Sequence, residues 1–248
     1  MRSRTDIALV TGAARGLGTE IARALAGQKM RVVLADIDAE AVEAAAREID
    51  PSGERAFGIS LDIRSVQSIV QARVQIERRW SAVSALVNNA AVTPMTGLWD
   101  ITAEEFDAVV TTNLRGTFLM SREFAGPMRA QAYGRIVNLG SLAGQSGGSG
   151  TGAHYAASKA GIGVLTKIFA RELQSAGIAV NCVAPGPLDG PLARAAAPEL
   201  FEKVKRAIPV GHLGDMSSIA AIIAWLASPD ADFVSGACWD MNGGLSMR

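Results

Sequence analysis

Tyr155 and Lys159 have the residue types and the spacing for proton transfer, since they stand four positions apart at the start of a helical pattern. Both side chains should therefore project from one helix face, about one turn apart. A nearby ammonium favours phenolate over phenol and brings the phenol pKa, ordinarily about 10, toward the working range of a general acid or base. Ser141 ends an apolar run fourteen residues upstream, where its hydroxyl could hydrogen-bond a substrate oxygen.

A glycine-rich turn at residues 11–18 predicts a dinucleotide site. Its glycines, spaced G-x-x-x-G-x-G between a strand pattern and a helix pattern, let backbone amides and the helix amino end approach a pyrophosphate. Asp36 ends the next strand pattern, eighteen residues after Gly18, where a carboxylate accepts hydrogen bonds from ribose hydroxyls. Because Asp36 would repel a phosphate on that ribose, it favours NAD over NADP, whereas Arg15 pulls weakly the other way.

Polar residues follow the third and fourth predicted strands, at Asp62 and at Asn89. The carboxyl ends of parallel strands meet at one sheet edge, so we expect these side chains beside the adenosine of a dinucleotide. Asx residues after strands are also ordinary turn formers, which is the alternative for both. Asn113 lies inside an apolar helical run, and a satisfied core amide would explain it.

These residues must be positioned by alternating strands and helices. Apolar runs without alternation predict strands at residues 7–10, 31–35, 56–60, 85–88, 135–138, 179–183 and 237–241. Helical patterns cover residues 16–28, 39–49, 65–80, 103–131, 154–176 and 216–227. This order predicts a doubly wound α/β fold, with a parallel sheet covered on both faces and ligands at the carboxyl ends of the strands. We expect one domain over residues 1–248, with a mobile substrate lid at about 186–210.

The composition argues against several classes of partner. With 24 basic and 24 acidic residues the formal net charge is zero, so we expect neither nucleic acid nor an anionic membrane as a partner. Cys182 and Cys238 have no metal-ligand spacing, which predicts buried free thiols rather than a disulfide or a metal site. The chain shows no signal-peptide core and no apolar run long enough for a membrane span, so we expect a cytoplasmic protein.

The chain resembles the short-chain dehydrogenase/reductase family over essentially its whole length, through TGAARGLG at 11–18, NNAA at 88–91, Asn113, Ser141, YAASK at 155–159 and PG at 185–186. The resemblance implies a Rossmann-type sheet of about seven parallel strands and a nicotinamide cofactor. It assigns Tyr155 as the general acid/base and Ser141 to orienting the substrate oxygen. It also assigns Lys159 to the nicotinamide ribose and to lowering the Tyr155 pKa, and Asn113 to a water relay.

The resemblance and the strand ends together define the expected contacts. The cofactor-binding residues expected are Gly12, Arg15, Gly16, Leu17, Gly18, Asp36, Ile37, Asp62, Ile63, Asn89, Ala90, Ala91, Tyr155, Lys159, Pro185, Gly186 and Leu188. The substrate contacts expected are Ser141, Met95, Leu142, Gln145, Pro187 and Leu192. The chain departs from the family pattern at Ala91, usually Gly. It also has Gly190 where relatives commonly place a Thr that binds the nicotinamide carboxamide, so a weaker hold on the cofactor is the hypothesis for Gly190.

Within the family, residues 208–214 and 241–244 look like those of 3-oxoacyl thioester reductases. Such reductases usually favour NADPH, in conflict with Asp36, and carry basic residues for an acidic carrier protein where this chain has Ala132 and Ala176. We therefore expect an NAD-dependent oxidoreductase that interconverts a small or medium secondary alcohol and its ketone. One alternative is an NADPH-dependent 3-oxoacyl thioester reductase. The other is a non-catalytic dinucleotide-binding sensor or scaffold.

Apolar residues cover more than one face of the helical patterns at 103–131 and 154–176, which suggests a partner of the same kind. The family resemblance makes a homotetramer the expected assembly. His154 precedes Tyr155, but neighbours on a helix point about 100° apart, so we expect a structural or interface role rather than a second base.

Overall fold

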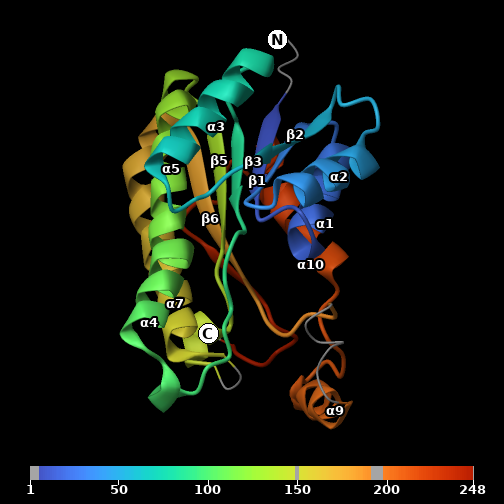
Figure 1. The fold of residues 1–248 in the computed structure, drawn as a ribbon, viewed down its shortest axis with the longest axis vertical. Helices are drawn as coiled ribbons and strands as arrows, with labels where there is room; N and C mark the ends of the chain where they lie inside the picture. Colours follow the sequence, from blue (N-terminus) through green and yellow to red (C-terminus); the bar gives the residue numbers. More distant parts are fainter. Residues whose placement is uncertain (1–5, 149–150, 191–197, 248) are drawn as a thin grey trace.

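The computed structural model describes residues 6–148, 151–190 and 198–247. Within them, seven strands form one parallel sheet in the order β3-β2-β1-β4-β5-β6-β7 (Figure 1). The strands are β1 (Ile7–Thr11), β2 (Arg31–Asp36), β3 (Ala56–Ser60), β4 (Ala85–Asn88), β5 (Gly134–Leu139), β6 (Ile178–Pro185) and β7 (Cys238–Met241). The predicted Rossmann-type sheet is confirmed.

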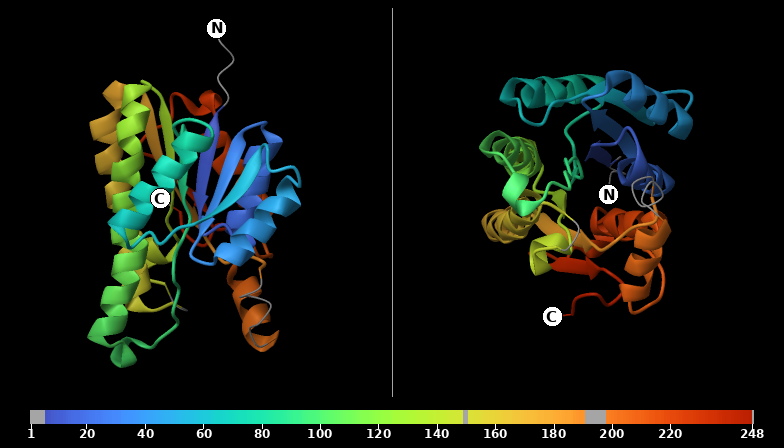
Figure 2. Two further views of the ribbon diagram at one scale, coloured as in Figure 1. Left: turned by 45° about the horizontal axis from the view of Figure 1, so that its top comes forward. Right: turned by 60° about the horizontal axis from the view of Figure 1, so that its bottom comes forward.

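Helices cover both faces of this sheet because successive strand residues point to opposite sides (Figure 2). Ala8 and Val10 belong to one buried cluster, whereas Ile7 and Leu9 belong to the other. The first cluster includes residues of α1 (Gly16–Gly27), α2 (Ala39–Ile49) and α10 (Met216–Leu226). The second includes residues of α3 (Val66–Arg79), α5 (Gly116–Ala130) and α7 (Ala153–Leu173). Both faces are apolar, which explains why the strand sequences show no polar alternation.

The direction of strand addition reverses between β3 and β4. β1 pairs with β2 on one side and with β4 on the other, so the chain returns to the middle of the sheet after β3. In doubly wound sheets this reversal leaves a crevice outside the carboxyl ends of the two central strands, where ligands bind. The carboxyl ends point toward the end of the molecule where α4 (Ala103–Val110) and α9 (Pro198–Ala207) lie (Figure 1).

The helix predicted over residues 103–131 is present as one continuous helical run, but it contains a π-helical segment that was not predicted. The run consists of α4, the π segment at Thr111–Arg115 and α5. Asn113 lies within the π segment and is completely buried. A π turn inside a helix holds an extra residue and changes the helix register. The side chains of α4 and α5 therefore point in directions that a regular helix would not give them.

The predicted lid, about residues 186–210, contains the loop up to Gly190 and helix α9, and residues 191–197 between them lie outside the described part. The helix predicted over 154–176 is present as α7 with a 3-10 turn at Gln174–Ala176. Cys182 and Cys238 lie at paired positions of β6 and β7 and form no disulfide, and only Cys182 is buried as predicted, since Cys238 is half-buried. Among the described helices, none has both the length and the apolar character needed to cross a bilayer.

Candidate active site

The structure brings Ser141, Tyr155 and Lys159 together at the carboxyl end of β5. Ser141 follows this strand, and the other two residues lie in the first turns of α7. The Ser141 hydroxyl is close enough to the Tyr155 phenol to oppose the effect of burial on the phenol pKa. Lys159 Nζ lies 5.7 Å from the centre of the Tyr155 ring and donates a hydrogen bond of 2.6 Å to the Leu139 carbonyl. The helical spacing thus places the phenol and the ammonium on one face, as predicted.

The two titratable groups are shifted by burial more than by each other. Burial raises the pKa of Tyr155 above its usual value near 10, and hydrogen bonds with Ser141 and Thr93 act in the opposite direction. Burial lowers the pKa of Lys159 to about 8, while the neighbouring Cys182 acts weakly the other way. The expectation that Lys159 draws down the Tyr155 pKa stays a prediction, and burial of the phenol is the largest effect on that pKa in this structure.

Asn113 joins three elements through its carboxamide. Its Oδ1 accepts the Val92 N–H at 2.8 Å, and its Nδ2 donates to the Val92 carbonyl at 3.0 Å and to Ser158 Oγ at 3.1 Å. These bonds tie the segment after β4 to the π turn and to α7. The main-chain carbonyl of Asn113 accepts a hydrogen bond of 2.7 Å from Thr117 Oγ1. The side chain is therefore the satisfied core amide that its sequence context suggested.

The glycine turn fits a dinucleotide because its backbone packs closely against neighbouring atoms at Gly12 and Gly18 and has free space at Gly16. Gly12 has φ +65°, and a Cβ there would lie 2.7 Å from Ala90 Cα. A Cβ at Gly18 would lie 2.1 Å from the Gly12 carbonyl oxygen. At Gly16, with φ +61°, a Cβ would meet no described atom within 4 Å. Side chains are excluded beneath the turn, and free space remains where a pyrophosphate could meet the amino end of α1.

Asn89 and Thr11 hold the turn in place. Asn89 Nδ2 donates to the carbonyls of Thr11 and Gly12 at 2.9 and 3.0 Å. Thr11 Oγ1 accepts the N–H groups of Asn89 and Ala90 at 3.0 and 3.1 Å. The side chain of Asn89, just after the adjacent strand β4, thus supports the turn. Ala91, two residues further on, is exposed.

The two carboxylates predicted beside the adenosine have different surroundings. Asp36 accepts the N–H groups of Ala14 and Asp38, both at 3.2 Å, so its charge lies against the glycine turn. Asp62 forms a bidentate pair with Arg64, at 2.9 Å for each nitrogen, and hydrogen bonding to Arg64 lowers the pKa of Asp62. The charge of Asp62 is therefore balanced by Arg64, whereas Asp36 bonds backbone N–H groups at the glycine turn.

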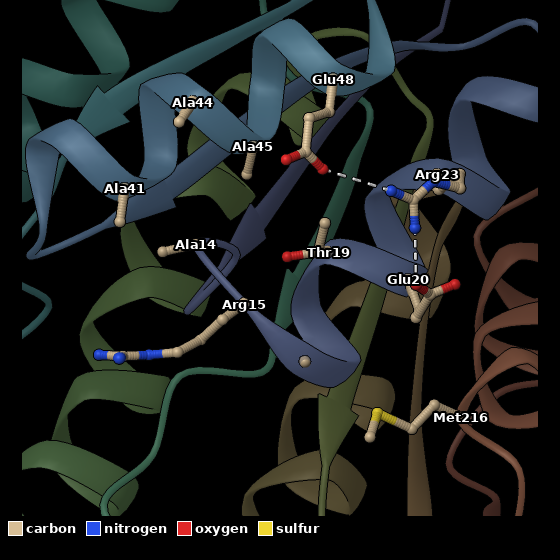
Figure 3. Close-up of a pocket in the computed structure, with 11 residues that line it drawn as sticks. Ala14, Arg15, Thr19, Glu20, Arg23, Ala41, Ala44, Ala45, Glu48 and Met216 are labelled. Carbon is tan, nitrogen blue, oxygen red and sulfur yellow. Dashed lines mark hydrogen bonds and ion pairs between the residues drawn. The ribbon is translucent and has the colours of Figure 1, made fainter. Parts of the chain in front are cut away.

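A cavity of about 490 Å³ opens between α1 and α2, next to the glycine turn (Figure 3). Residues 14–16 form one edge, and Met216 of α10 lies at another. Arg23 and Glu48, 3.8 Å apart, form an ion pair between the two helices. Tyr155 does not line this cavity. The cavity therefore lies beside the glycine turn and away from the proton-transfer residues.

The other residues expected to contact the cofactor divide into buried and open positions. Leu17 and Leu188 pack against the cluster that contains α1 and α10, and Ile63 is buried in the other cluster. Ile37 is 62% exposed. Pro185 ends β6, and the N–H of Gly186 donates to the Met241 carbonyl at 2.9 Å.

Of the expected substrate contacts, Leu142 and Gln145 lie closest to Ser141 in the chain, around the short helix α6 (Ala143–Ser146). Gln145 Nε2 hydrogen-bonds Asp240 of β7, a residue absent from the prediction. Met95 is 60% exposed in the loop after β4. Pro187 lines a separate cavity of about 210 Å³, and Leu192 lies outside the described residues.

Sequence reasoning missed Thr93, whose hydroxyl, like that of Ser141, opposes the effect of burial on the pKa of Tyr155. It also missed Glu105, whose Oε1 lies 3.0 Å from His154 Nε2. Thr93 has one usable signal, since it is a hydroxyl residue in the loop directly after NNAA. The link between Glu105 and His154 joins residues far apart in the chain and has no signal in the spacing.

Comparison with known proteins places the chain among related enzymes. A family model described as "Enoyl-(Acyl carrier protein) reductase" matches residues 12–246. The 3-oxoacyl-[acyl-carrier-protein] reductase FabG of Vibrio cholerae is 36% identical over 247 residues, 100% of each chain. FabG of Staphylococcus aureus is 36% identical over 244 residues, 98% of this chain and 99% of the relative. These relatives favour the 3-oxoacyl alternative over a simple alcohol.

A solved structure supports the fold and the enzyme class. A putative gluconate dehydrogenase from Agrobacterium tumefaciens superposes with a TM-score of 0.92 and is 30% identical, over 97% of this chain and 95% of the other. Its name indicates a different substrate from that of the reductases. The relatives thus agree on oxidation and reduction of a carbonyl or alcohol and differ in substrate. With its seven-stranded parallel sheet and its motifs, the chain belongs to the short-chain dehydrogenase/reductase family of oxidoreductases.

Proposed function

We propose that the protein interconverts a secondary alcohol and a ketone with NAD(H), and that Tyr155 exchanges the proton with the substrate oxygen. The observation that carries the proposal is the half-buried Tyr155 phenol, which lies beside Ser141 and has the Lys159 ammonium 5.7 Å from its ring centre. A protein that only binds a dinucleotide needs none of these three groups. The arrangement therefore speaks against the sensor or scaffold alternative.

Each side chain has a distinct task in this proposal. The Ser141 hydroxyl orients the substrate oxygen next to the Tyr155 phenol, which gives its proton in reduction and takes it back in oxidation. Lys159, fixed by the Leu139 carbonyl, keeps a cationic group beside the phenol and can reach a ribose hydroxyl. A bound nicotinamide dinucleotide supplies the hydride. The chain itself contributes positioning and proton transfer.

The preference for NAD(H) rests on Asp36. Its carboxylate lies against the glycine turn through Ala14 and Asp38, where a phosphate on the adenosine ribose would meet a negative charge. Arg15 at the same turn is exposed, so its charge is screened by solvent. The pyrophosphate would bind at Gly16 and the amino end of α1.

A second candidate is reduction of a 3-oxoacyl thioester, which the FabG relatives favour. The reacting group is a ketone in both cases, so the proton-transfer residues would be the same. Ala132 and Ala176 lie just before β5 and β6, at the amino edge of the sheet, whereas Ser141 follows β5 at the carboxyl edge. Because both residues are alanines, these two positions offer no positive charge to an acidic carrier protein.

The test is an absorbance assay of reduced cofactor with NAD and NADP in parallel. Oxidation is measured with a panel of secondary alcohols, and reduction with simple ketones and with a 3-oxoacyl group on coenzyme A and on an acyl-carrier protein. We expect turnover of simple alcohols and ketones with NAD(H), and none in Tyr155→Phe, which should still bind NAD. Turnover confined to the carrier-bound 3-oxoacyl group with NADPH would establish the second candidate instead. Equal activity of Tyr155→Phe would remove both.

We also propose that the protein is a homotetramer. Support comes from apolar side chains that α5 and α7 leave exposed, namely Phe118 at 36%, Val164 at 58% and Ile168 at 40%. Light scattering at micromolar concentration should give four times the 25.8 kDa mass of the chain. A monomeric mass would contradict this assembly.

A further inference from the structure

Cys182 and Cys238 lie opposite each other on two neighbouring strands. They are partners in the register of β6 and β7, and the Cys182 N–H donates to the carbonyl of Ala237, the residue before Cys238, at 2.9 Å. Paired strands lie about 4.8 Å apart, and a disulfide needs about 4.4–6.8 Å between its two Cα atoms. The backbone therefore already holds the two residues at a spacing that a disulfide can bridge.

The two sulfurs also lie on the same side of the sheet. Successive residues of a strand alternate between the two faces, so partners in register share one face, and the surroundings of both sulfurs agree with this. A Cβ at Gly140, which follows β5, would lie 2.7 Å from Cys182 Sγ. Gln145 of α6 has its Nε2 3.7 Å from Cys238 Sγ. Both sulfurs thus face the segment that runs from the end of β5 into α6.

The two thiols differ in their access to solvent. Cys182 is 1% exposed, whereas Cys238 is half-buried and lies on β7, at one edge of the sheet that the described strands form. The nearby Cys238 and burial raise the pKa of the Cys182 thiol well above its usual range. Oxidation follows exposure and thiolate character, so an oxidant from solvent reacts first with Cys238, and Cys182 remains a protonated thiol beside it.

The segment that both sulfurs face leads directly to the active site. Gly140 immediately precedes Ser141, and its N–H donates to the Val183 carbonyl at 2.8 Å. Since a Cβ on Gly140 would meet Cys182 Sγ, this sulfur packs directly against the glycine backbone. A bond between the two sulfurs draws Cys182 Sγ toward Cys238 and removes this contact. Closing the pair should therefore shift the backbone that positions Ser141.

We propose that Cys182 and Cys238 form a site of oxidative modification, which hydrogen peroxide closes to a disulfide and which slows turnover when closed. The Cys238 thiolate attacks the peroxide: an S–O bond forms, the O–O bond breaks, and the leaving hydroxide takes up the thiol proton. The Cys182 sulfur then attacks this sulfenic acid: an S–S bond forms, the S–O bond breaks, and the Cys182 proton leaves with the oxygen as water. The two thiols are oxidised by two electrons in total, and the peroxide is reduced to two waters. The effect on turnover, but not the modification, rests on the proposed function.

The test exposes the reduced protein to hydrogen peroxide and then to trypsin under non-reducing conditions. The chain has two cysteines, and cleavage after Lys and Arg leaves them in separate peptides, residues 172–194 and 207–248. We expect loss of both thiols and one product in which these two peptides are joined, from a protein that keeps the mass of a single chain on a denaturing gel. Dithiothreitol should restore both thiols. A link between chains, or added oxygen on unlinked peptides, would overturn the proposal.

Two variants provide matched controls. In Cys182→Ala no second thiol can attack the oxidised Cys238, so we expect sulfinic and sulfonic acids that dithiothreitol does not reverse. In Cys238→Ala we expect the buried Cys182 to keep its thiol. If Cys182→Ala does not fold, Cys182→Ser takes its place. Loss of the Cys182 thiol in Cys238→Ala as fast as in wild type would show that Cys238 is not required, and would overturn the proposal.

A kinetic arm uses the substrate found in the assay above. The oxidised wild type should have a kcat about tenfold below that of the reduced protein, because Ser141 is displaced, and dithiothreitol should restore it. The same exposure to peroxide should leave the kcat of Cys238→Ala unchanged. An equal loss of kcat in Cys238→Ala would overturn the effect of the disulfide on turnover. Joined peptides in a protein without any turnover would instead remove the proposed function and retain the modification site.

Discussion

His154 Nε2 and Glu105 Oε1 lie 3.0 Å apart and join α4 to the first turn of α7. The imidazole is buried and directly precedes Tyr155, yet its ring points away from the proton-transfer site toward α4. The expected structural role of His154 is thereby given a specific partner. The pair also connects the register of α4 to the position of the catalytic helix.

Replacing His154 should destabilise the fold, because Glu105 and the Tyr155 N–H would both lose a buried partner. We expect His154→Ala to lower the free energy of unfolding by about 1–3 kcal/mol, measured by urea denaturation at pH 7. His212, which is exposed and bonded through Nδ1 to the Leu213 carbonyl, provides the control. An equally large loss in His212→Ala would show that the effect is not specific to the contacts of His154 with Glu105 and the Tyr155 N–H.

Glu105 should make stability depend on acidic pH. Its hydrogen bonds with Thr96 and then with His154 lower the pKa of Glu105 below its ordinary 4.5. A carboxylate whose folded pKa is depressed stabilises the fold above the unfolded value, and this contribution is lost as pH falls through the folded pKa. Urea midpoints of wild type and Glu105→Gln should therefore differ at pH 7 and converge below pH 4.5. A constant difference would contradict the shift.

Lys159 should be a site where stability is sacrificed for function. Burial lowers its pKa from 10.5 to about 8, so the charged folded form costs about 3 kcal/mol at pH 7. Between these two values the unfolded chain binds more protons, and stability should rise with pH. Lys159→Met should remove this cost but strand the Leu139 carbonyl, for a net gain of about 2 kcal/mol at pH 7 and less above pH 10.

The measurement for Lys159 is urea denaturation of both proteins from pH 7 to pH 10, alongside turnover. Lys167, on the same helix, supplies a control, since Lys167→Met removes an exposed charge. A Lys159→Met protein that is less stable than wild type at pH 7 would show that the ammonium is stabilised rather than penalised by its surroundings.

Asp36 should decide between the two dinucleotides. Asp36→Asn removes the charge and keeps one acceptor oxygen, for either the Ala14 or the Asp38 N–H, each of which bonds a different oxygen of Asp36. We expect the ratio of the NADP to the NAD dissociation constant, measured by calorimetry, to fall about tenfold. Asp38→Asn is the matched control, because Asp38 caps α2 through the Ala41 N–H. An unchanged ratio in Asp36→Asn would shift the discrimination to another residue.

Met216 lies next to Gly190, the position where the family resemblance implies a threonine. A Cβ at Gly190 would lie 2.3 Å from Met216 Cε, the end of a flexible side chain, so the Met216 methyl has to move before a side chain fits at position 190. Gly190→Thr alone should therefore leave dinucleotide affinity unimproved, while Gly190→Thr combined with Met216→Ala should tighten it severalfold. Calorimetry on both variants and on Met216→Ala checks this. A gain from Gly190→Thr alone would support the simpler hypothesis that Gly190 weakens cofactor retention.

The strands were predictable because both faces of the sheet are covered, so each strand reads as an uninterrupted apolar run. Ser141, Tyr155 and Lys159 were predictable because strand end and helix spacing place them together. The π turn at Thr111–Arg115 was not, because apolar residues continue across it with helical spacing and the partner of Asn113, Val92, lies outside the helix.

The direction of the Tyr155 shift also escaped prediction. Helical spacing gives the distance between the phenol and the ammonium but not how deeply the fold buries them, and burial is the larger effect here. Asp62 is a similar case, since its pairing with Arg64 depends on a local turn rather than on the strand that precedes it.

The π turn at Thr111–Arg115 also bears on the history and redesign of this chain. One residue advances an α-helix by about 100°, so deleting a single residue from this turn would restore a regular helix and rotate α4 relative to α5 by that angle. Glu105 would then no longer face His154, although no residue of either would have changed. Insertions and deletions in this segment should therefore be rarer among functional homologues than substitutions. Grafts between family members are best joined outside residues 103–130.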